Sequence, residues 1–208
     1  MSRYGGKVGS ANDHVHDLVD FVRASPSSYH ATAEIARRLT DTGFAGQADT
    51  DAWDSSPGGH FLIRDGALIA WRIPDGANAL TPFRMICSHT DSPTFKLKPN
   101  PDLRSAGYAQ LGVEIYGGPL LNSWLDRELG IAGRVVTDGD VRLVSSAAVA
   151  RIPQLALHLD RGVNEEGLKL DRQRHTAPIW ATYDRERSVL EHIGQRPVAR
   201  LLKSLALI

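Results

Sequence analysis

His89 and Asp91 are the residues whose types and spacing could do chemistry. They lie in the stretch "RMICSHTDSPTFKLKP" at residues 84–99, where an apolar run ends shortly before Pro93. Side chains two positions apart in a strand point to the same side, so the imidazole and the carboxylate are expected to share a face. The imidazole could bind a metal ion while the carboxylate orients it. Taken alone, such a pair is more often a surface turn or a satisfied polar cluster.

The other histidines do not complete a metal site in an obvious way. A catalytic zinc ion takes about three protein ligands and keeps one position open. The chain has eight histidines, and none belongs to a His-Glu-X-X-His pair. His14 and His16 lie near the N-terminus and are expected to be solvated. The histidines without a distinguishing context are His30, His60, His175 and His192.

The apolar run at residues 83–88 must position this pair. It is predicted to be a fully buried strand, and open α/β folds place their ligand crevices at strand ends. Two Asp-Gly hairpins are predicted on either side of it in the sequence. The first spans residues 60–73 and turns at Asp65-Gly66, and the second spans residues 133–144 and turns at Asp138-Gly139.

Two helices are predicted before the first hairpin. The stretch "DHVHDLVDFVRASP" ends at Pro26, because proline cannot continue a helix. Its apolar residues, on one helical face, are Val15, Leu18, Val19 and Val22. The second helix lies in "SSYHATAEIARRLTDTGF", with Ser28 as its N-cap and Gly43 as its stop. Its expected core positions are Ala31, Ile35 and Leu39.

The last third of the sequence gives weaker signals. Residues 151–162 fit a short helix or, because alternate residues are leucine, a strand, and the helix is favoured. Residues 182–195 and 196–208 are predicted to be helical. The apolar residues at the end of the chain are Leu201, Leu202, Leu205, Leu207 and Ile208. Such a segment either docks onto the fold or indicates a chain that stops in the middle of a larger fold.

Composition restricts the class of protein. The 208 residues are 42% hydrophobic, with 24 basic and 24 acidic side chains. A balanced charge with no basic stripe argues against a nucleic-acid partner, and no apolar stretch is long enough for a membrane span. Neither a signal segment nor a phosphate-binding loop is recognised. The single cysteine, Cys87, suits a reducing cytoplasm, so we expect a soluble cytoplasmic protein.

Longer segments carry a family resemblance. "SHTDSPTFKLKP", "GYAQLGVEIYGGPLLNSWLDRELGIAGRV" and "RIPQLALHL", in that order, closely resemble the aspartyl aminopeptidases, metallopeptidase family eighteen. The resemblance extends to "LVDFVRASPSSYHATAEIARRL" and to "ALIAWRI" in the first hairpin. The chain therefore resembles the N-terminal half of such an enzyme.

The resemblance implies a fold and an activity. The expected fold is α/β, with the start of a zinc-exopeptidase catalytic domain over residues 1–92. An inserted β-rich dimerisation domain and a following segment would occupy residues 93–208. The family removes N-terminal residues, often acidic ones, from peptides with two zinc ions per complete site. It is cytoplasmic and forms homo-oligomers built from dimers.

The resemblance also implies roles for three residues. His89 matches a zinc ligand, and Asp91 matches the catalytic-site carboxylate that supports this ligand and the metal pair. His158 matches a histidine assigned either as a metal ligand or as a residue that reaches the partner subunit's active site. Asp126 and Glu128 lie in a matching motif and are expected to have structural roles.

The sequence departs from the family because the remaining ligands and the general-base glutamate lie in a C-terminal half that is not found here. "NEEG" at residues 164–167 is interpreted as a polar turn. The primary hypothesis is therefore a metalloaminopeptidase, here truncated. The alternative is a non-catalytic oligomerisation or binding module derived from such an enzyme.

Overall fold

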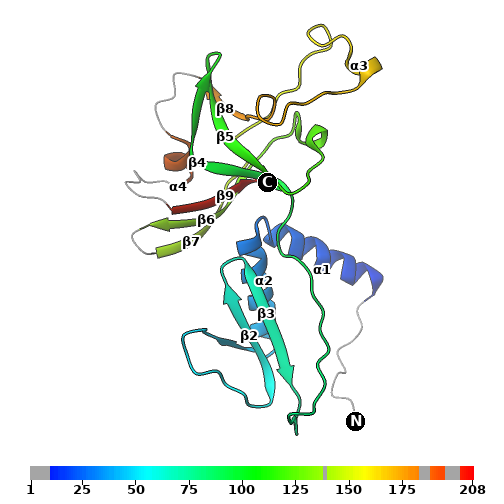
Figure 1. Ribbon diagram of the computed structural model, residues 1–208, viewed down its shortest axis with the longest axis vertical. Helices are drawn as coiled ribbons and strands as arrows, with labels where there is room; N and C mark the ends of the chain where they lie inside the picture. The colour runs from blue at the N-terminus through cyan, green and yellow to red at the C-terminus, as the bar shows by residue number, and fades with distance from the viewer. Residues whose placement is uncertain (1–9, 138–139, 183–187, 195–201) are drawn as a thin grey trace. The chain divides into compact units, whose positions relative to one another are not determined.

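The chain folds into two units, Met1–Asp91 and Ser92–Ile208, which are described separately. The computed structural model describes residues 10–137, 140–182, 188–194 and 202–208. Helices and strands occur in both units, so the expected α/β composition is confirmed (Figure 1). None of the described helices has the length and apolar character needed to span a membrane.

The first helix, α1 (Ala11–Ala24), forms where the sequence predicts it. Ser10 caps it, because its hydroxyl accepts a hydrogen bond from Asp13 N while Asp13 Oδ2 accepts one from Ser10 N at 2.7 Å. This reciprocal capping box satisfies two donors at the helix start. The apolar residues of the predicted face are all exposed, namely Val15, Leu18, Val19 and Val22.

The second helix, α2 (Ser28–Asp41), begins one residue earlier than a Ser28 cap would require. Ser27 is the N-cap, since its side chain accepts a hydrogen bond from His30 N. The chain leaves the helix at Gly43, whose φ of 86° lies in the left-handed region that favours glycine. The buried helix residues are Ala31, Thr32 and Ala36, whereas Ile35 and Leu39 are half-buried.

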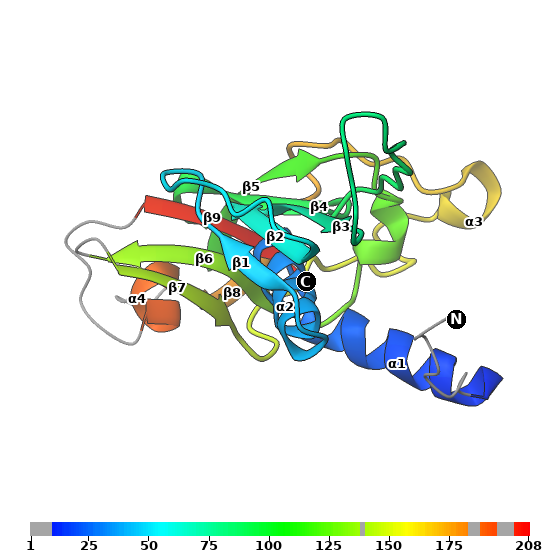
Figure 2. The ribbon, with the colours of Figure 1, turned by 90° about the horizontal axis from the view of Figure 1, so that it is seen from below.

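A three-stranded sheet accompanies these helices in the first unit, with strand order β1-β2-β3 (Figure 2). β1 (Ala45–Gln47) is parallel to β2 (Gly58–Arg64), which pairs antiparallel with β3 (Ala67–Ile73). The predicted hairpin is confirmed, with Arg64 opposite Ala67 across a two-residue loop. β3 is consequently an edge strand of this sheet.

The prediction of a buried strand at residues 83–88 is wrong. The segment is extended but pairs with no strand of the described chain, and its side chains are exposed. Phe83 is 90% exposed, Met85 84% and Ile86 101%. A β-strand needs backbone partners on a neighbouring strand, and the apolar composition that predicted burial cannot supply them.

The second unit contains a six-stranded sheet with the order β7-β6-β9-β4-β5-β8. Its strands are β4 (Thr94–Ser105), β5 (Tyr108–Tyr116), β6 (Ile131–Thr137), β7 (Asp140–Ser145), β8 (Ile179–Thr182) and β9 (Leu202–Leu207). The helical pieces of this unit are short: η1 (Leu121–Trp124), α3 (Val163–Glu166) and α4 (Val189–Gly194). This unit is therefore rich in β-structure.

Two hairpins organise this sheet. β6 and β7 form the predicted one, with Thr137 opposite Asp140, while its turn residues lie outside the described residues. β4 and β5 form a second hairpin that the sequence patterns did not indicate. Its loop is Ala106-Gly107, with φ of 49° and 79°. Positive φ at both positions matches the twist of a hairpin, but alanine there lacks the usual Asn or Asp signal.

The prediction of a helix over residues 196–208 is wrong where the structure describes them. Residues 202–207 form β9, which lies between β6 and β4 in the sheet. Leu205 and Leu207 are 2% and 0% exposed. Because they are two residues apart in a strand, both point to the same face, which is the core face. The apolar end of the chain therefore docks.

Two further segments differ in outcome. In the segment at residues 151–162, Arg151 and Ile152 are the two residues that make isolated β-bridges. Residues 153–162 form neither the favoured helix nor a strand. The helix predicted at residues 182–195 is confirmed over α4, while residues 183–187 and 195 lie outside the described residues.

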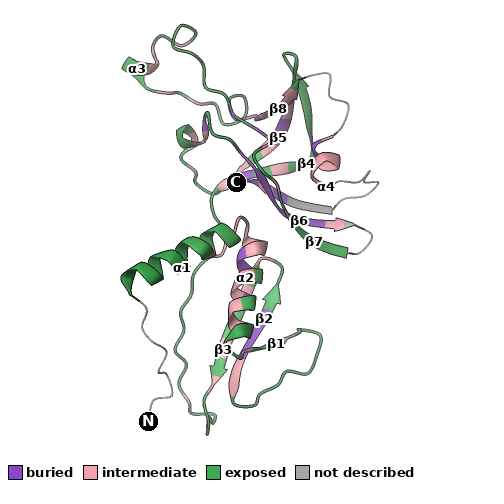
Figure 3. Cartoon of the chain, turned by 180° about the vertical axis from the view of Figure 1, so that it is seen from behind, coloured by how far each residue is buried: buried purple, intermediate pink, exposed green. Residues whose placement is uncertain are grey.

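The core of the second unit is built largely from residues of its strands, and Figure 3 marks the buried ones in purple. Phe95 is fully buried, and its ring centroid lies 4.8 Å from that of Trp124 in an edge-to-face arrangement. Such aromatic pairs combine a large buried area with a favourable geometry. Other fully buried core residues are Leu111, Ile131, Val189 and Leu207.

Candidate metal site

His89 and Asp91 lie close together, although not in a strand. His89 Nδ1 is 2.7 Å from the Asp91 carbonyl oxygen and 3.2 Å from its carboxylate Oδ1. A carbonyl oxygen can only accept, so Nδ1 carries the proton in this hydrogen bond. The lone pair of the imidazole is then on Nε2. The side chains are 80% and 42% exposed, so Nε2 is accessible to a metal ion.

Thr90 fixes the position of this pair within the first unit. Its hydroxyl donates a hydrogen bond to the carbonyl oxygen of Gly66 at 2.6 Å. Gly66 lies in the turn between β2 and β3, so the segment that carries His89 is tied to the start of β3. The imidazole and the carboxylate thus flank an anchored residue.

His158 lies in the second unit, whereas His89 and Asp91 belong to the first. It is exposed, in a turn closed by a hydrogen bond from Leu159 N to the carbonyl oxygen of Ala156 at 2.8 Å. Exposed leucines flank it on both sides, with Leu157 at 54% and Leu159 at 67%. His158 therefore lies on the surface of the second unit, in an exposed loop with apolar neighbours.

The chemistry of the donor set fits part of a zinc site. An imidazole held by a carboxylate is the arrangement in which a neighbouring group fixes the tautomer of a metal-ligating histidine. Across the described ranges, no group of three or more His, Cys, Asp or Glu side chains is arranged to hold a metal ion. His89 and Asp91 therefore supply part of a ligand set that needs further donors.

Asp126 has the structural role that the sequence predicts. Its Oδ1 lies 3.8 Å from Arg151 Nε and accepts a hydrogen bond from Gln154 N at 3.3 Å. Its own carbonyl oxygen accepts from the Arg151 guanidinium at 2.8 Å. Asp126 has a φ of 54°, a conformation that aspartate tolerates better than most residues. These contacts hold the segment around Asp126 to residues 151–154.

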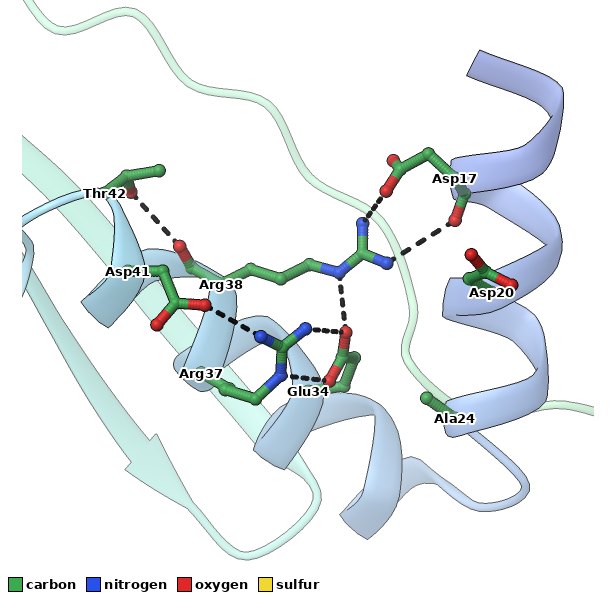
Figure 4. A pocket seen from close by; sticks show the side chains of 8 residues that line it. All are labelled: Asp17, Asp20, Ala24, Glu34, Arg37, Arg38, Asp41 and Thr42. Atoms are coloured by element: carbon green, nitrogen blue, oxygen red, sulfur yellow. Dashed lines mark hydrogen bonds and ion pairs between the residues drawn. The ribbon is translucent and has the colours of Figure 1, made fainter. Parts of the chain in front are cut away.

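A pocket between α1 and α2 contains a charged network that the sequence analysis missed (Figure 4). Glu34 Oε1 lies 2.7 Å from both Arg37 Nη2 and Arg38 Nε. Arg37 also pairs with Asp41, and Arg38 reaches Asp17 on α1, each at 2.7 Å. The spacing of Glu34 to the two arginines, three and four residues, was the available signal. His89, Asp91 and His158 do not line this pocket.

Glu34 makes the stability of the first unit depend on pH. Hydrogen bonds from Arg37 and then Arg38 lower the pKa of Glu34 from 4.5 to about 2. The Glu34 side chain is 12% exposed, but Arg37 and Arg38 are 58% and 31% exposed, so solvent screens part of the interaction. A lowered folded-state pKa contributes stability above the unfolded pKa, and this stability is lost as the pH falls towards the folded pKa.

We expect Glu34→Gln to be destabilising at pH 7 and much less so at about pH 2, where Glu34 is protonated in the unfolded state and half protonated in the folded state. The measurement is urea unfolding of both proteins across this pH range. Glu166→Gln is the matched control, because Glu166 pairs with Lys169 at a surface where the two side chains are 66% and 75% exposed. An equal effect of Glu34→Gln at both pH values would contradict the assignment.

Comparisons with known proteins place the chain in a family. Residues 21–206 match the family described as aminopeptidase I zinc metalloprotease (M18). A probable M18 family aminopeptidase 2 of Streptomyces avermitilis is 57% identical over 169 residues, which are 80% of this chain and 39% of the relative. The Mycobacterium leprae protein of that name is 40% identical over 190 residues, covering 86% and 44%.

Solved structures agree with this placement. Ape4, in its complex with Nbr1, matches with a TM-score of 0.84 and 29% identity over 100% of this chain and 46% of Ape4. The mApe1 protein of Chaetomium thermophilum matches with a TM-score of 0.81 and 26% identity, over 94% of this chain and 50% of mApe1. The chain belongs to the M18 metalloprotease family, as the resemblance implied. It spans well under half the length of these curated relatives.

Proposed function

We propose that the chain is the N-terminal part of a zinc metalloaminopeptidase that removes N-terminal residues, with a preference for acidic ones, from peptides. The single observation that carries the proposal is the His89–Asp91 pair within a chain that belongs to the M18 family. In this proposal residues 1–92 belong to the catalytic domain. Residues 93–208 comprise the dimerisation domain and a following segment.

The proposed site assigns a task to each residue. His89 would hold a zinc ion through Nε2, because Nδ1 is engaged by Asp91. Asp91 would keep the imidazole in this tautomer and orientation. A bound zinc ion supplies hydroxide near neutral pH by lowering the pKa of its water. The proposal includes two zinc ions per complete site, to which other residues contribute.

The proposal extends to assembly and location. A neighbouring solved structure is the S. cerevisiae mApe1 dodecamer, with a TM-score of 0.73 and 28% identity to this chain. This likeness supports a homo-oligomer, and we propose that it is built from dimers. His158 would then act either as a metal ligand or at the active site of a neighbouring subunit, and its exposed loop suits both roles. We propose a cytoplasmic location.

The test is zinc titration observed through the histidine side chains by nuclear magnetic resonance. We expect zinc to shift the Nε2 resonance of His89, and His89→Ala to remove specific zinc binding. Asp91→Asn should lower zinc affinity by about 10- to 100-fold, because the ligand loses the carboxylate charge 3.2 Å from Nδ1 while it keeps the contact with the main-chain carbonyl oxygen. His16→Ala is the control, since His16 is an exposed histidine of the same unit. Unchanged zinc affinity in His89→Ala would refute the ligand role.

A second candidate function is a non-catalytic binding or oligomerisation module. The observation that favours it is that no three-residue metal cluster forms within the part of the chain that the structure describes. An aminopeptidase assay with Asp-, Glu- and Leu-anilide substrates tests the enzyme. Activity with zinc, manganese or cobalt that disappears in His89→Ala supports the enzyme, whereas inactivity with every metal is expected both of a fragment of the enzyme and of the module.

A further inference from the structure

His60 is a buried titratable residue that the proposed metal site does not use. It lies on β2 and is 2% exposed. The segment that joins β1 to β2, residues 48–57, is called the β1–β2 loop here (Figure 3). The Nε2 atom of His60 is 2.9 Å from the carbonyl oxygen of Ser56, and its Nδ1 is 2.8 Å from Nε2 of Gln47. The imidazole therefore contacts the loop near its end and β1 at the point where the loop begins.

These partners require a neutral imidazole. A carbonyl oxygen only accepts, so Nε2 of His60 carries a proton. An amide nitrogen only donates, so Nδ1 presents its lone pair to Gln47. The orientation of the Gln47 amide is fixed independently, because the same amide nitrogen lies 2.9 Å from the carbonyl oxygen of Asp54, where an amide oxygen would be repelled. One Gln47 amide group thus serves both His60 and the loop.

A second proton on His60 is incompatible with this arrangement. It would place two donors against each other on a side chain that is almost fully buried, where an unmade hydrogen bond is costly. The Gln47 amide can turn over so that Oε1 accepts from Nδ1. This oxygen has no hydrogen-bond partner among the described residues that the turn would break. The turn would, however, bring Oε1 against the carbonyl oxygen of Asp54, so the loop loses that hydrogen bond.

Stacked aromatic rings connect the same loop to His60. Trp53 of the loop stacks on Trp71 of β3 with 5.5 Å between ring centroids, and Trp71 stacks on His60 at 5.7 Å. The Trp53 indole N–H also donates to the carbonyl oxygen of Ala48 at 3.1 Å. Trp53 is 55% exposed, so this end of the stack faces solvent. Opening of the loop would therefore part Trp53 from Trp71.

Charged groups on the neighbouring elements act differently on a protonated imidazole. Asp54 of the loop interacts electrostatically with the ring and attracts its charged form, as does the stacked indole. Arg64 of β2 is paired with Asp49 of the loop at 2.6 Å. On β3, Arg72 lies one position beyond the stacked tryptophan and so points to the opposite face. On α2, the charged network of Glu34 reaches towards α1. Burial and the opposed amide donor resist the proton that Asp54 and the indole favour.

We propose that protonation of His60 is a switch that releases the β1–β2 loop as the pH falls through the range of about 8 to 5 in which imidazole groups change charge. The loop is closed while Nδ1 accepts from Gln47, and it opens when Nδ1 carries a proton. The open state binds more protons than the closed state, so closure is favoured as the pH rises and is lost as the pH falls. Release uncovers the face of Trp71 on which Trp53 stacks. The switch stands independently of whether His89 binds zinc.

A pH titration of the 208-residue chain by nuclear magnetic resonance tests the switch. The ring nitrogens of His60 report its protonation, and amide-hydrogen exchange in residues 48–57 reports opening of the loop. After correction for the intrinsic effect of pH on exchange, we expect protection in the loop to fall about tenfold as His60 gains its proton, the change that one proton produces per pH unit. The Trp53 indole N–H resonance should shift over the same range, while exchange in β6 stays constant.

Two variants separate the switch from a general effect of acid. In Gln47→Glu, a carboxylate accepts from Nδ1–H and no donor remains for Asp54. We therefore expect His60 to be charged, and the loop to exchange rapidly, already at pH 7.5. In His60→Gln, the titrating group is absent, and loop exchange should no longer depend on pH. His16→Gln is the matched control because His16 is an exposed histidine of α1, and it should keep the response of the parent.

Each outcome decides the proposal. Protonation of His60 without a change in loop exchange would overturn it, and so would a His60 that stays neutral down to pH 5. A loop that opens at the same pH in His60→Gln would assign the response to another group. Circular dichroism checks that the variants fold. Should His60→Gln unfold, the parent and Gln47→Glu still decide, because a closed loop in Gln47→Glu at pH 7.5 would contradict the role of the amide.

Discussion

Leu207→Asp will unfold the second unit, although Leu207 is the last residue but one of the chain. Leu207 is 0% exposed in β9, where it lies opposite Ile131. Its carbonyl oxygen accepts a hydrogen bond from the Thr94 hydroxyl of β4. A carboxylate at this position would lie in the apolar core without a charge partner, which costs several kcal/mol.

The expected destabilisation exceeds about 4 kcal/mol, a large share of the stability of a typical domain. β9 joins β6 to β4, so its loss divides the six-stranded sheet. The measurement is urea unfolding, with hydrogen exchange to locate the effect in the second unit. Ile208→Asp is the matched control because Ile208 is 38% exposed, and about 1 kcal/mol is expected there. Similar losses in the two variants would show that β9 is not central.

Phe95→Ala will have the second largest effect, a loss of about 3–5 kcal/mol in the free energy of unfolding. Phe95 is fully buried on β4, so its removal loses the transfer free energy of the ring and leaves a cavity in a core that relaxes only partly. The edge-to-face contact with Trp124 is lost as well.

A double-mutant cycle measures that contact separately. We expect a coupling of about 0.5–1.5 kcal/mol between Phe95→Ala and Trp124→Ala, typical of aromatic pairs. Leu103→Ala, on the same strand but 44% exposed, should cost less than about 1 kcal/mol and controls for a general effect on β4. Zero coupling would mean that burial alone explains the role of Phe95.

The local elements of the fold could be predicted because their signals lie within a few residues. Asp-Gly predicted the β2–β3 hairpin, and helical periodicity, with Pro26 after the first helix and Gly43 after the second, predicted α1 and α2. The β4–β5 hairpin was missed because Ala106-Gly107 carries a weaker turn signal. Residues 202–207 were assigned to a helix because a short apolar run fits both periodicities, and only pairing with β6 and β4 makes it a strand.

Part of the candidate site could likewise be predicted from the sequence, and part could not. The His-X-Asp spacing singled out His89 and Asp91. In the structure, Nδ1 of His89 contacts both the main-chain carbonyl oxygen and the carboxylate of Asp91. His158 was named by its motif, and its role remains a prediction. Further metal donors could not be named, because ligands of one ion come from distant segments whose juxtaposition no local pattern encodes.

The sequence by itself determined the family, the early helices and hairpins, and the pair His89 and Asp91, because motifs and short-range periodicities are local. The tertiary structure alone decided that residues 202–207 complete a sheet and that residues 83–88 pair with no strand of the described chain. Both are apolar segments of similar composition. Whether such a segment becomes a strand depends on backbone hydrogen-bond partners from elsewhere in the fold, and composition does not reveal their presence.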